Sequence, residues 1–413
     1  MALLLRICFL SLVFWLSTLP AQAATTAGIT WYYNEKVDRA HPGNFEILPN
    51  GNILYCRNSF HDPAVVELTP AGKEVWRYGP LPAAAARRLK NGHTLIADSG
   101  MPGPPRRPAV LEVDGRGRVI WRYEFPDRAE APRYIEPLEG GRILVVTRNT
   151  LLYLVPPGQI TWRYTAADLI NLVSASCLPG GHILLVDAGL GGRGKVREID
   201  ARGKTVWEYR GEERFGGLQR PVAATRLRGG LTLIVDAGNN RLLVVSKDRK
   251  LESVNGWPQL GPVTLWSALP QAEDRIWLAL SRYGQGQLVR YQGRLPKILL
   301  DGDNYFTLDL PLKTETAALF PARELFSALG ATLDWDQAVS SLNIAYNSHN
   351  LSLQVGRLSA MLDRKPVRLQ APPVLSGGRL FIPPEVFSLL GGGRWDSKNQ
   401  ILYLERQKGE RNP

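Results

Sequence analysis

Short apolar runs separated by glycine-rich turns recur along residues 28–300. One unit passes the turn Asn91-Gly92, continues as an apolar run over 94–97, and reaches a second run over 110–113. Each clear unit is bordered by an aromatic segment, whose tryptophans are Trp31, Trp76, Trp121, Trp162 and Trp207. Short apolar runs bounded by turn residues are typical of strands, and the units lack the 3.6-residue period of an amphipathic helix.

Four short strands in each repeat of 41 or 45 residues predict a blade of a β-propeller. Five repeats are clear, and residues 263–270, 275–282 and 286–293 supply three strands of a sixth. The N-terminal segment 28–33 then supplies its fourth strand and closes the ring, which protects an open sheet edge. We therefore predict a mainly β fold with a six-bladed β-propeller over residues 28–300. Seven blades remain an alternative if residues 295–300 begin another set of strands. The tryptophans are expected to fill the space between adjacent blades.

The repeat ends after residue 300, and a helix-and-strand pattern follows over residues 305–406. An amphipathic segment that contains Phe326 stops at Gly330, the residue type expected just past a helix end. Trp335-Asp336 lies in the hairpin that follows, and about 60 residues later the same order returns around Phe387 and Trp395-Asp396. This part is predicted to be a small, internally duplicated α+β domain.

Residues 1–23 predict a secretory signal peptide. Arg6 precedes an apolar run over 7–16, and Ala21-Gln22-Ala23 forms a cleavage site of small residues. A retained N-terminal anchor is the alternative. Later stretches fall short of 18 apolar residues, so we expect a secreted protein, extracellular or associated with the cell envelope, without a transmembrane span.

The formal net charge is +12, and the basic residues are scattered. In a secreted protein this charge suits anionic cell-wall polymers or lipid surfaces, although it can also serve solubility alone. Nucleic acid is not expected, because a basic helix or aromatic-basic platform is missing. Cys56 and Cys177 lie in apolar runs of distant repeats and are predicted to be buried free thiols. Neither cysteine pattern nor histidine spacing predicts a metal site, and we expect no cofactor.

Two family resemblances follow from these motifs. The segment 236–245, "DAGNNRLLVV", and segments such as "LPNGNILY" and "VVELTPAGKEVWRY" resemble NHL-type, quinoprotein-like and arylsulfotransferase propellers. Residues 305–406 resemble the copper amine oxidase N-terminal-like domain, although Pro384-Glu385 departs from its pattern. That resemblance implies a stalk or attachment module. It does not imply an amine oxidase, because His349 is the only histidine beyond His182 and cannot hold copper alone.

One column of residues follows the second strand of each repeat and should gather near one face of the channel: Arg57, Asp98, Thr147, Asp187, Asp236 and Leu280. We predict ligand binding by Arg57, Asp98, Asp187 and Asp236. The alternative is that each aspartate caps its own turn. His61 is a candidate catalytic residue only if the propeller is an enzyme.

These observations favour a non-catalytic binding protein of the cell envelope over an enzyme. The propeller would bind a cell-wall polymer, glycan or protein partner, and the C-terminal domain would attach or space it. A sulfotransferase- or lyase-type enzyme acting in the propeller channel is the alternative, and a structural scaffold of a surface layer is a third reading. The oligomeric state is left open.

Overall fold

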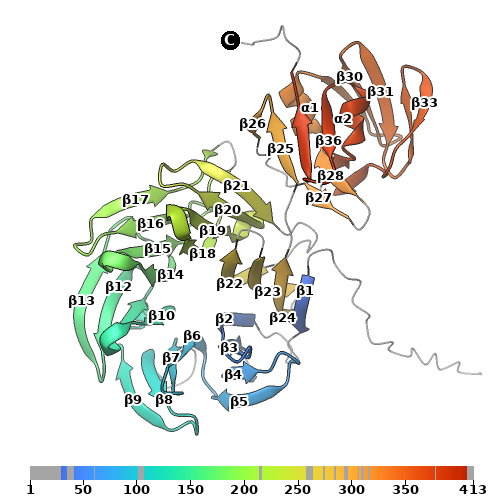
Figure 1. Ribbon diagram of the computed structural model, residues 1–413. Coiled ribbons are helices and arrows are strands. Elements are labelled where there is room, and N and C mark those ends of the chain that lie inside the picture. Colours follow the sequence, from blue (N-terminus) through green and yellow to red (C-terminus); the bar gives the residue numbers. More distant parts are fainter. Residues whose placement is uncertain are drawn as a thin grey trace, which may run out of the picture.

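The computed structural model shows a mainly β chain with two α-helices in the described part (Figure 1). It describes residues 29–34, 41–59, 61–100, 107–213, 216–256, 264–272, 275–282, 285–292, 296–305, 307, 311–314, 317–376 and 378–406. The predicted signal peptide, residues 1–23, lies outside these residues. None of the described helices has the length and apolar character that crossing a membrane requires.

Between residues 29 and 292 the described strands form six four-stranded antiparallel sheets. In chain order, the sheets comprise β2 (His41–Ile47), β3 (Ile53–Asn58), β4 (Ala64–Leu68) and β5 (Glu74–Tyr78); β6 (Ala83–Arg88), β7 (Thr94–Asp98), β8 (Ala109–Val113) and β9 (Val119–Glu124); β10 (Tyr134–Pro137), β11 (Ile143–Val146), β12 (Thr150–Val155) and β13 (Gln159–Thr165); β14 (Leu172–Cys177), β15 (Ile183–Asp187), β16 (Lys195–Ile199) and β17 (Thr205–Tyr209); β18 (Pro221–Arg226), β19 (Thr232–Asp236), β20 (Arg241–Val245) and β21 (Leu251–Gly256); and β22 (Thr264–Ala272), β23 (Arg275–Arg282), β24 (Gln285–Gln292) and β1 (Ile29–Asn34).

The first strands of the sheets contact one another in a closed cycle. β2 contacts β6, the series continues through β10, β14, β18 and β22, and β22 contacts β2 again. The same succession is visible as the change from blue to gold around the ring in Figure 1. β1 pairs with β24, so the predicted pairing of the N-terminal strand with the last sheet is confirmed. This arrangement is consistent with a β-propeller.

The core of this ring lies between neighbouring sheets. Each buried apolar cluster draws side chains from two adjacent sheets, and the cluster of Phe45, Tyr55 and Trp277 joins the first sheet to the sixth. The repeating tryptophans add polar bridges. The indole N–H of Trp76 donates to the carbonyl of Gly115 in the next sheet (3.1 Å), and that of Trp207 donates to the carbonyl of Lys247 (3.0 Å).

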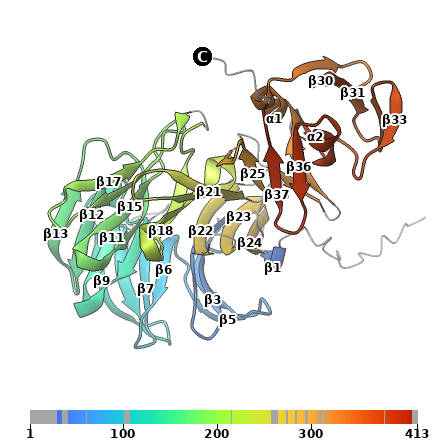
Figure 2. The same cartoon turned by 45° about the horizontal axis from the view of Figure 1, so that its top comes forward.

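Residues 297–404 form a second set of sheets with two helices (Figure 2). Its elements are β25 (Lys297–Leu300), β26 (Asp303–Asn304), β27 (Leu312–Lys313), β28 (Ala318–Pro321), α1 (Ala322–Leu329), β29 (Thr332–Asp336), β30 (Ser341–Tyr346), β31 (His349–Gln354), β32 (Ser359–Leu362), β33 (Lys365–Arg368), β34 (Val374–Ser376), β35 (Arg379–Ile382), α2 (Glu385–Leu389), β36 (Gly393–Asp396) and β37 (Ile401–Leu404). β25 pairs in parallel with β37, so residues 297–300 belong to this part and not to a seventh propeller sheet.

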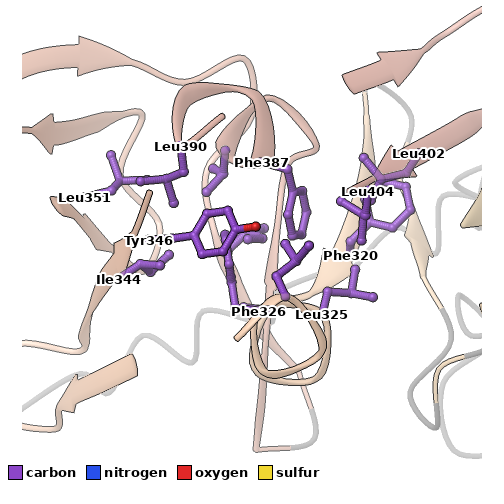
Figure 3. Close-up of a cluster of buried hydrophobic side chains, with 14 of the residues drawn as sticks. Phe320, Leu325, Phe326, Ile344, Tyr346, Leu351, Phe387, Leu390, Leu402 and Leu404 are labelled. Atoms are coloured by element: carbon purple, nitrogen blue, oxygen red, sulfur yellow. The ribbon is translucent and has the colours of Figure 1, made fainter. Parts of the chain in front are cut away.

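The two helices share one core. Phe326 of α1 stacks on Phe387 of α2 with ring centroids 4.8 Å apart, and both rings are fully buried (Figure 3). Phe320 meets the edge of Phe387 at 6.4 Å. α1 is followed by the capping residue Gly330, whose φ of +83° is costly for a residue with a Cβ atom. The repeated Phe, Gly and Trp-Asp positions therefore place two similar halves around a common set of rings.

Candidate binding face of the propeller

The four residues predicted to bind a ligand lie at the ends of second strands. Arg57 lies near the end of β3, and Asp98, Asp187 and Asp236 end β7, β15 and β19. We call the face formed by these strand ends the loop face. The exposed fraction is 5% for Arg57 and at most 1% for each aspartate, so the side chains lie beneath the surface. Direct ligand contact stays a prediction, and the contacts of these side chains suggest an indirect part.

Asp187 ties two loops together. Its carboxylate accepts the backbone N–H groups of Ile170 (3.1 Å) and Asn171 (2.9 Å) from the segment before β14. It also accepts the N–H of Gly189 (2.9 Å) from the loop after β15. Because three donors come from two separate segments, the carboxylate fixes the shape of the loop face at this point.

Asp236 makes a similar junction in the next sheet. It accepts the N–H of Gln219 (2.7 Å) and is paired with Arg241, whose Nε lies 2.7 Å away. Burial raises the pKa of the Asp236 carboxyl, and the charge of Arg241 acts against that rise. Asp98 accepts the N–H of Gly100 (3.0 Å) and lies 3.5 Å from a guanidinium nitrogen of Arg122.

Arg57 belongs to a chain of ion pairs in the first sheet. Its guanidinium lies 3.1 Å from both Asp62 and Glu74, and Arg77 pairs with Asp62 on the outside. His61 lies beside this chain in the bend between β3 and β4. Its side chain is exposed, and its backbone N–H donates to the Ser59 hydroxyl (3.2 Å). A catalytic role for His61 stays a prediction of the enzymatic alternative.

One ion-pair cluster on this face was missed by the sequence analysis. Asp168, before β14, accepts from Lys195 (2.7 Å) and pairs with Arg197, which also contacts Glu208 (2.6 Å). The hydrogen bond from Arg197, joined by that from Lys195, lowers the pKa of the Asp168 carboxyl. The alternating basic and apolar residues in "KVREI" are the available signal, since they place both cations on one side of β16.

Two other propeller histidines, His93 and His182, are bound to glutamates at the opposite ends of the sheets. Nδ1 of His93 lies 2.6 Å from Glu112, and Nδ1 of His182 lies 2.7 Å from Glu198. Within the described ranges, a group of three or more His, Cys, Asp and Glu side chains placed to hold a metal ion is not found.

The cysteine prediction needs one correction. Both thiols are free, and Cys56 is completely buried. Cys177 is half-buried, because the space beside the end of β14 is open to a cleft between the third and fourth sheets.

The comparisons with known proteins match the two parts of the chain separately. Residues 300–404 match the copper amine oxidase N-terminal domain family, which confirms the resemblance predicted for the C-terminal segment. No curated protein is found to match the chain.

Several solved structures are similar to the propeller part. A protein of unknown function from Bacteroides caccae is 21% identical, with 55% of this chain and 86% of that chain covered and a TM-score of 0.44. A catalytically inactive virginiamycin B lyase from Staphylococcus aureus is 11% identical over 78% of this chain and 97% of its own (TM-score 0.46). Regucalcin from Agrobacterium tumefaciens, a calcium-binding protein, is 13% identical over 63% and 94% (TM-score 0.43). Similarity at this level says nothing about a shared ligand or reaction.

Proposed function

We propose that the chain is a secreted binding protein of the cell envelope. In this proposal a six-bladed propeller presents the loop face to a ligand, and the C-terminal domain attaches or spaces the propeller. The observation that carries the proposal is that Arg57, Asp98, Asp187 and Asp236 all make bonds that fix loops or pair charges. Loops held in one shape lose little conformational entropy on binding, which favours a recognition surface.

The four predicted residues act in this proposal as positioning residues. Their side chains are nearly inaccessible, so the ligand meets the loops that they hold. Exposed charged groups at the rim, such as Arg210, which lies 3.8 Å from Asp168, would make the first contacts. The basic formal charge of +12 supports an anionic polymer as the ligand, because opposite charges steer and hold such a partner.

The C-terminal domain supports an attachment role through its resemblance to modules of that kind. Its core depends on aromatic stacking between two small helices and is separate from the apolar clusters of the propeller. A self-contained core is what a spacer or anchor module requires, since such a module must stay folded while its partner domain binds.

Sedimentation with isolated cell walls tests this function. The protein from residue 24 onward would be mixed with walls that retain their anionic polymers and with walls from which those polymers were extracted. We expect the protein to sediment with the complete walls and to be released as the salt concentration rises. If the protein sediments with neither the complete nor the extracted walls, the proposal is refuted. Turnover of an aryl sulfate that His61→Ala abolishes would replace it by the enzymatic alternative.

A pair of variants locates the binding surface. Asp187→Ala removes three backbone bonds from the loop face, and we expect binding to weaken roughly tenfold. Asp114→Ala is the matched control, because Asp114 caps the turn between β8 and β9 at the opposite end of a sheet through the N–H groups of Arg116 and Arg118. Equal losses in both variants would contradict binding through the loop face.

A further inference from the structure

A cleft of about 1010 Å³ lies between the third and fourth sheets. It opens where second strands begin, at the end of the sheets opposite the loop face, so it is a different site from the one discussed above. The side chains that decide its chemistry are Glu136, Glu139, Tyr153, Trp162, Cys177 and Asp200.

The first and second sheets show what fills the corresponding space elsewhere. Arg88, the last residue of β6, stacks on the Trp76 ring at 5.0 Å and pairs with Glu67 at 2.7 Å. Glu67 and Trp76 face each other as paired residues of β4 and β5. The guanidinium therefore lies between an aromatic face and a carboxylate, and both charged side chains are mostly buried.

The fourth and fifth sheets repeat this arrangement. Arg226, the last residue of β18, stacks on Trp207 at 5.2 Å and pairs with Glu198. Glu198 and Trp207 are again paired residues of adjacent strands. At each of these two interfaces, therefore, an arginine of the chain itself occupies the same position of the repeat.

The interface between the third and fourth sheets keeps the tryptophan and loses the arginine. The last residue of β14 is Cys177, and the residue paired with Trp162 is Tyr153. In the described part of the chain, no arginine or lysine stacks on Trp162; Arg142 stacks on Tyr153 at 5.3 Å. A short thiol in place of a long guanidinium side chain leaves the space open, which accounts for the cleft.

A largely buried carboxyl group, that of Glu136, lines this cleft. Oε1 of Glu136 accepts the backbone N–H of Cys177 at 3.4 Å, whereas Oε2 is enclosed and has no hydrogen-bond partner among the described residues. A buried acceptor without a hydrogen-bond partner is costly, and a guanidinium in the cleft would relieve that cost beyond what the charge of Arg87 supplies. Glu139 and Asp200 add two more carboxyl groups to the lining, against the single guanidinium of Arg142.

We propose that this cleft binds an arginine side chain of a peptide or protein partner, whose guanidinium stacks on Trp162 beside the carboxyl groups of Glu136, Glu139 and Asp200. The guest group takes the place that Arg88 and Arg226 occupy from within the chain. The planar guanidinium suits a site with an aromatic face and carboxylates better than a lysine ammonium does. The site lies away from the loop face, so its test is independent of the function proposed above.

Cys177 provides a direct reporter of occupancy. Its half-exposed thiol lines the cleft, whereas Cys56 is fully buried and serves as an unreactive control in the same protein. The protein from residue 24 onward, which does not include Cys8, would be labelled with a maleimide in the presence of acetyl-Gly-Arg-Gly-amide or of the matched citrulline peptide. We expect the arginine peptide alone to slow the labelling of Cys177, since citrulline has the same shape without the charge. Equal protection by both peptides, or protection by neither, would overturn the proposal.

Two variants and one control variant separate recognition of the arginine from simple blocking of the cleft. Glu136→Gln should weaken binding of the arginine peptide about tenfold in a calorimetric titration, while Glu252→Gln on the exposed outer strand β21 should leave it unchanged. Cys177→Arg should fill the cleft from within, raise the melting temperature and abolish peptide binding. Undiminished binding by Glu136→Gln, or by a folded Cys177→Arg protein, would refute the site.

The pH dependence gives a readout that blocking alone would not produce. Burial raises the pKa of Glu136 to about 7, and the groups that face it are the N–H and thiol of Cys177, Arg87 of β6 and Tyr153 of β12. Affinity for the arginine peptide should increase as the pH rises through about 7, and Glu136→Gln should remove that increase. A wild-type affinity that does not change over this range would contradict the arrangement.

Discussion

Replacing Arg226 by cysteine would place a thiol beside Trp207 between the fourth and fifth sheets, as Cys177 lies near Trp162 between the third and fourth, while Glu198 stays where that natural interface has Tyr153. The guanidinium pairs with Glu198, donates to the Thr232 hydroxyl (2.7 Å) and to the Gly230 carbonyl (3.1 Å), and stacks on Trp207. All of these contacts would be lost together. The variant therefore measures what an internal arginine contributes at this position of the repeat.

The expected loss follows from burial and charge. The Arg226 and Glu198 side chains are only 15% and 16% exposed, so the pair is largely shielded from solvent. Charged hydrogen bonds contribute about 1.5–3 kcal/mol and a partly desolvated cation–π contact about 1 kcal/mol. His182 still contacts Glu198 at 2.7 Å and limits the cost of leaving that carboxylate behind. We expect the free energy of unfolding to fall by about 3 kcal/mol.

Urea unfolding followed by tryptophan fluorescence measures this change, and maleimide labelling of the introduced thiol reports whether a cleft has opened. Arg202→Cys is the control, because Arg202 is an exposed turn residue between β16 and β17 and should change stability by less than about 0.5 kcal/mol. Equal stability of the two variants, or an introduced thiol as unreactive as Cys56, would refute the claim that Arg226 fills this space.

Two further predictions concern the C-terminal core and the buried carboxyl group. Phe387→Ala should destabilise the C-terminal domain by about 4 kcal/mol, because a fully buried, stacked ring is lost, whereas Leu375→Ala, 49% exposed, should cost less than about 1 kcal/mol; urea unfolding checks both. Burial raises the pKa of Glu136 from 4.5 to about 7, although the hydrogen bond from the Cys177 N–H and the charge of Arg87 act in the opposite direction. Because the folded protein then holds this proton more tightly than the unfolded chain, the free energy of unfolding should fall by the order of 3 kcal/mol as the pH rises from about 4.5 to about 7. Melting curves of Glu136→Gln should lack that fall, and parallel pH profiles of both proteins would contradict it.

The sheet pattern was predictable because it repeats. Trp76, Trp121, Trp162 and Trp207 mark the same strand in successive sheets, and their spacing, together with the apolar runs and glycine turns between them, indicates four strands for each unit. The pairing of β1 with β24 was predictable because the last unit lacked a strand and the first segment had no sheet of its own. Both inferences start from short patterns within each strand and from the count of strands in each unit.

The partners across loops were not predictable in the same way. Asp168 meets Lys195 and Arg197 although 27 and 29 residues separate them in sequence. Which loop lies over which strand depends on the twist and packing of adjacent sheets, and a single sequence carries no direct record of either. The aspartates at strand ends are therefore predictable from the sequence, whereas the cations that surround Asp168 are not.

The burial of Cys177 shows a different kind of error. Its apolar surroundings in the sequence predicted a buried thiol, because an isolated strand says nothing about the sheet beside it. Comparing the repeats position by position would have given a signal: Arg88, Pro137, Cys177 and Arg226 end successive first strands, and Glu67, Glu112, Tyr153 and Glu198 pair with the tryptophans.

Two of these interfaces lack the arginine, and a comparison of the two explains why only one of them leaves a carboxyl oxygen without a partner. At the second and third sheets Pro137 replaces the arginine, yet Glu112 keeps its partners, since His93 and the Trp121 indole N–H both lie 2.6 Å from its carboxylate. At the third and fourth sheets the glutamate is replaced as well, and the buried carboxyl group there is that of Glu136 on β10, which accepts the backbone N–H of Cys177. Its Oε2 has no partner among the described residues. A repeat that loses the cation and keeps an unpaired carboxyl group is where a guest cation is most needed.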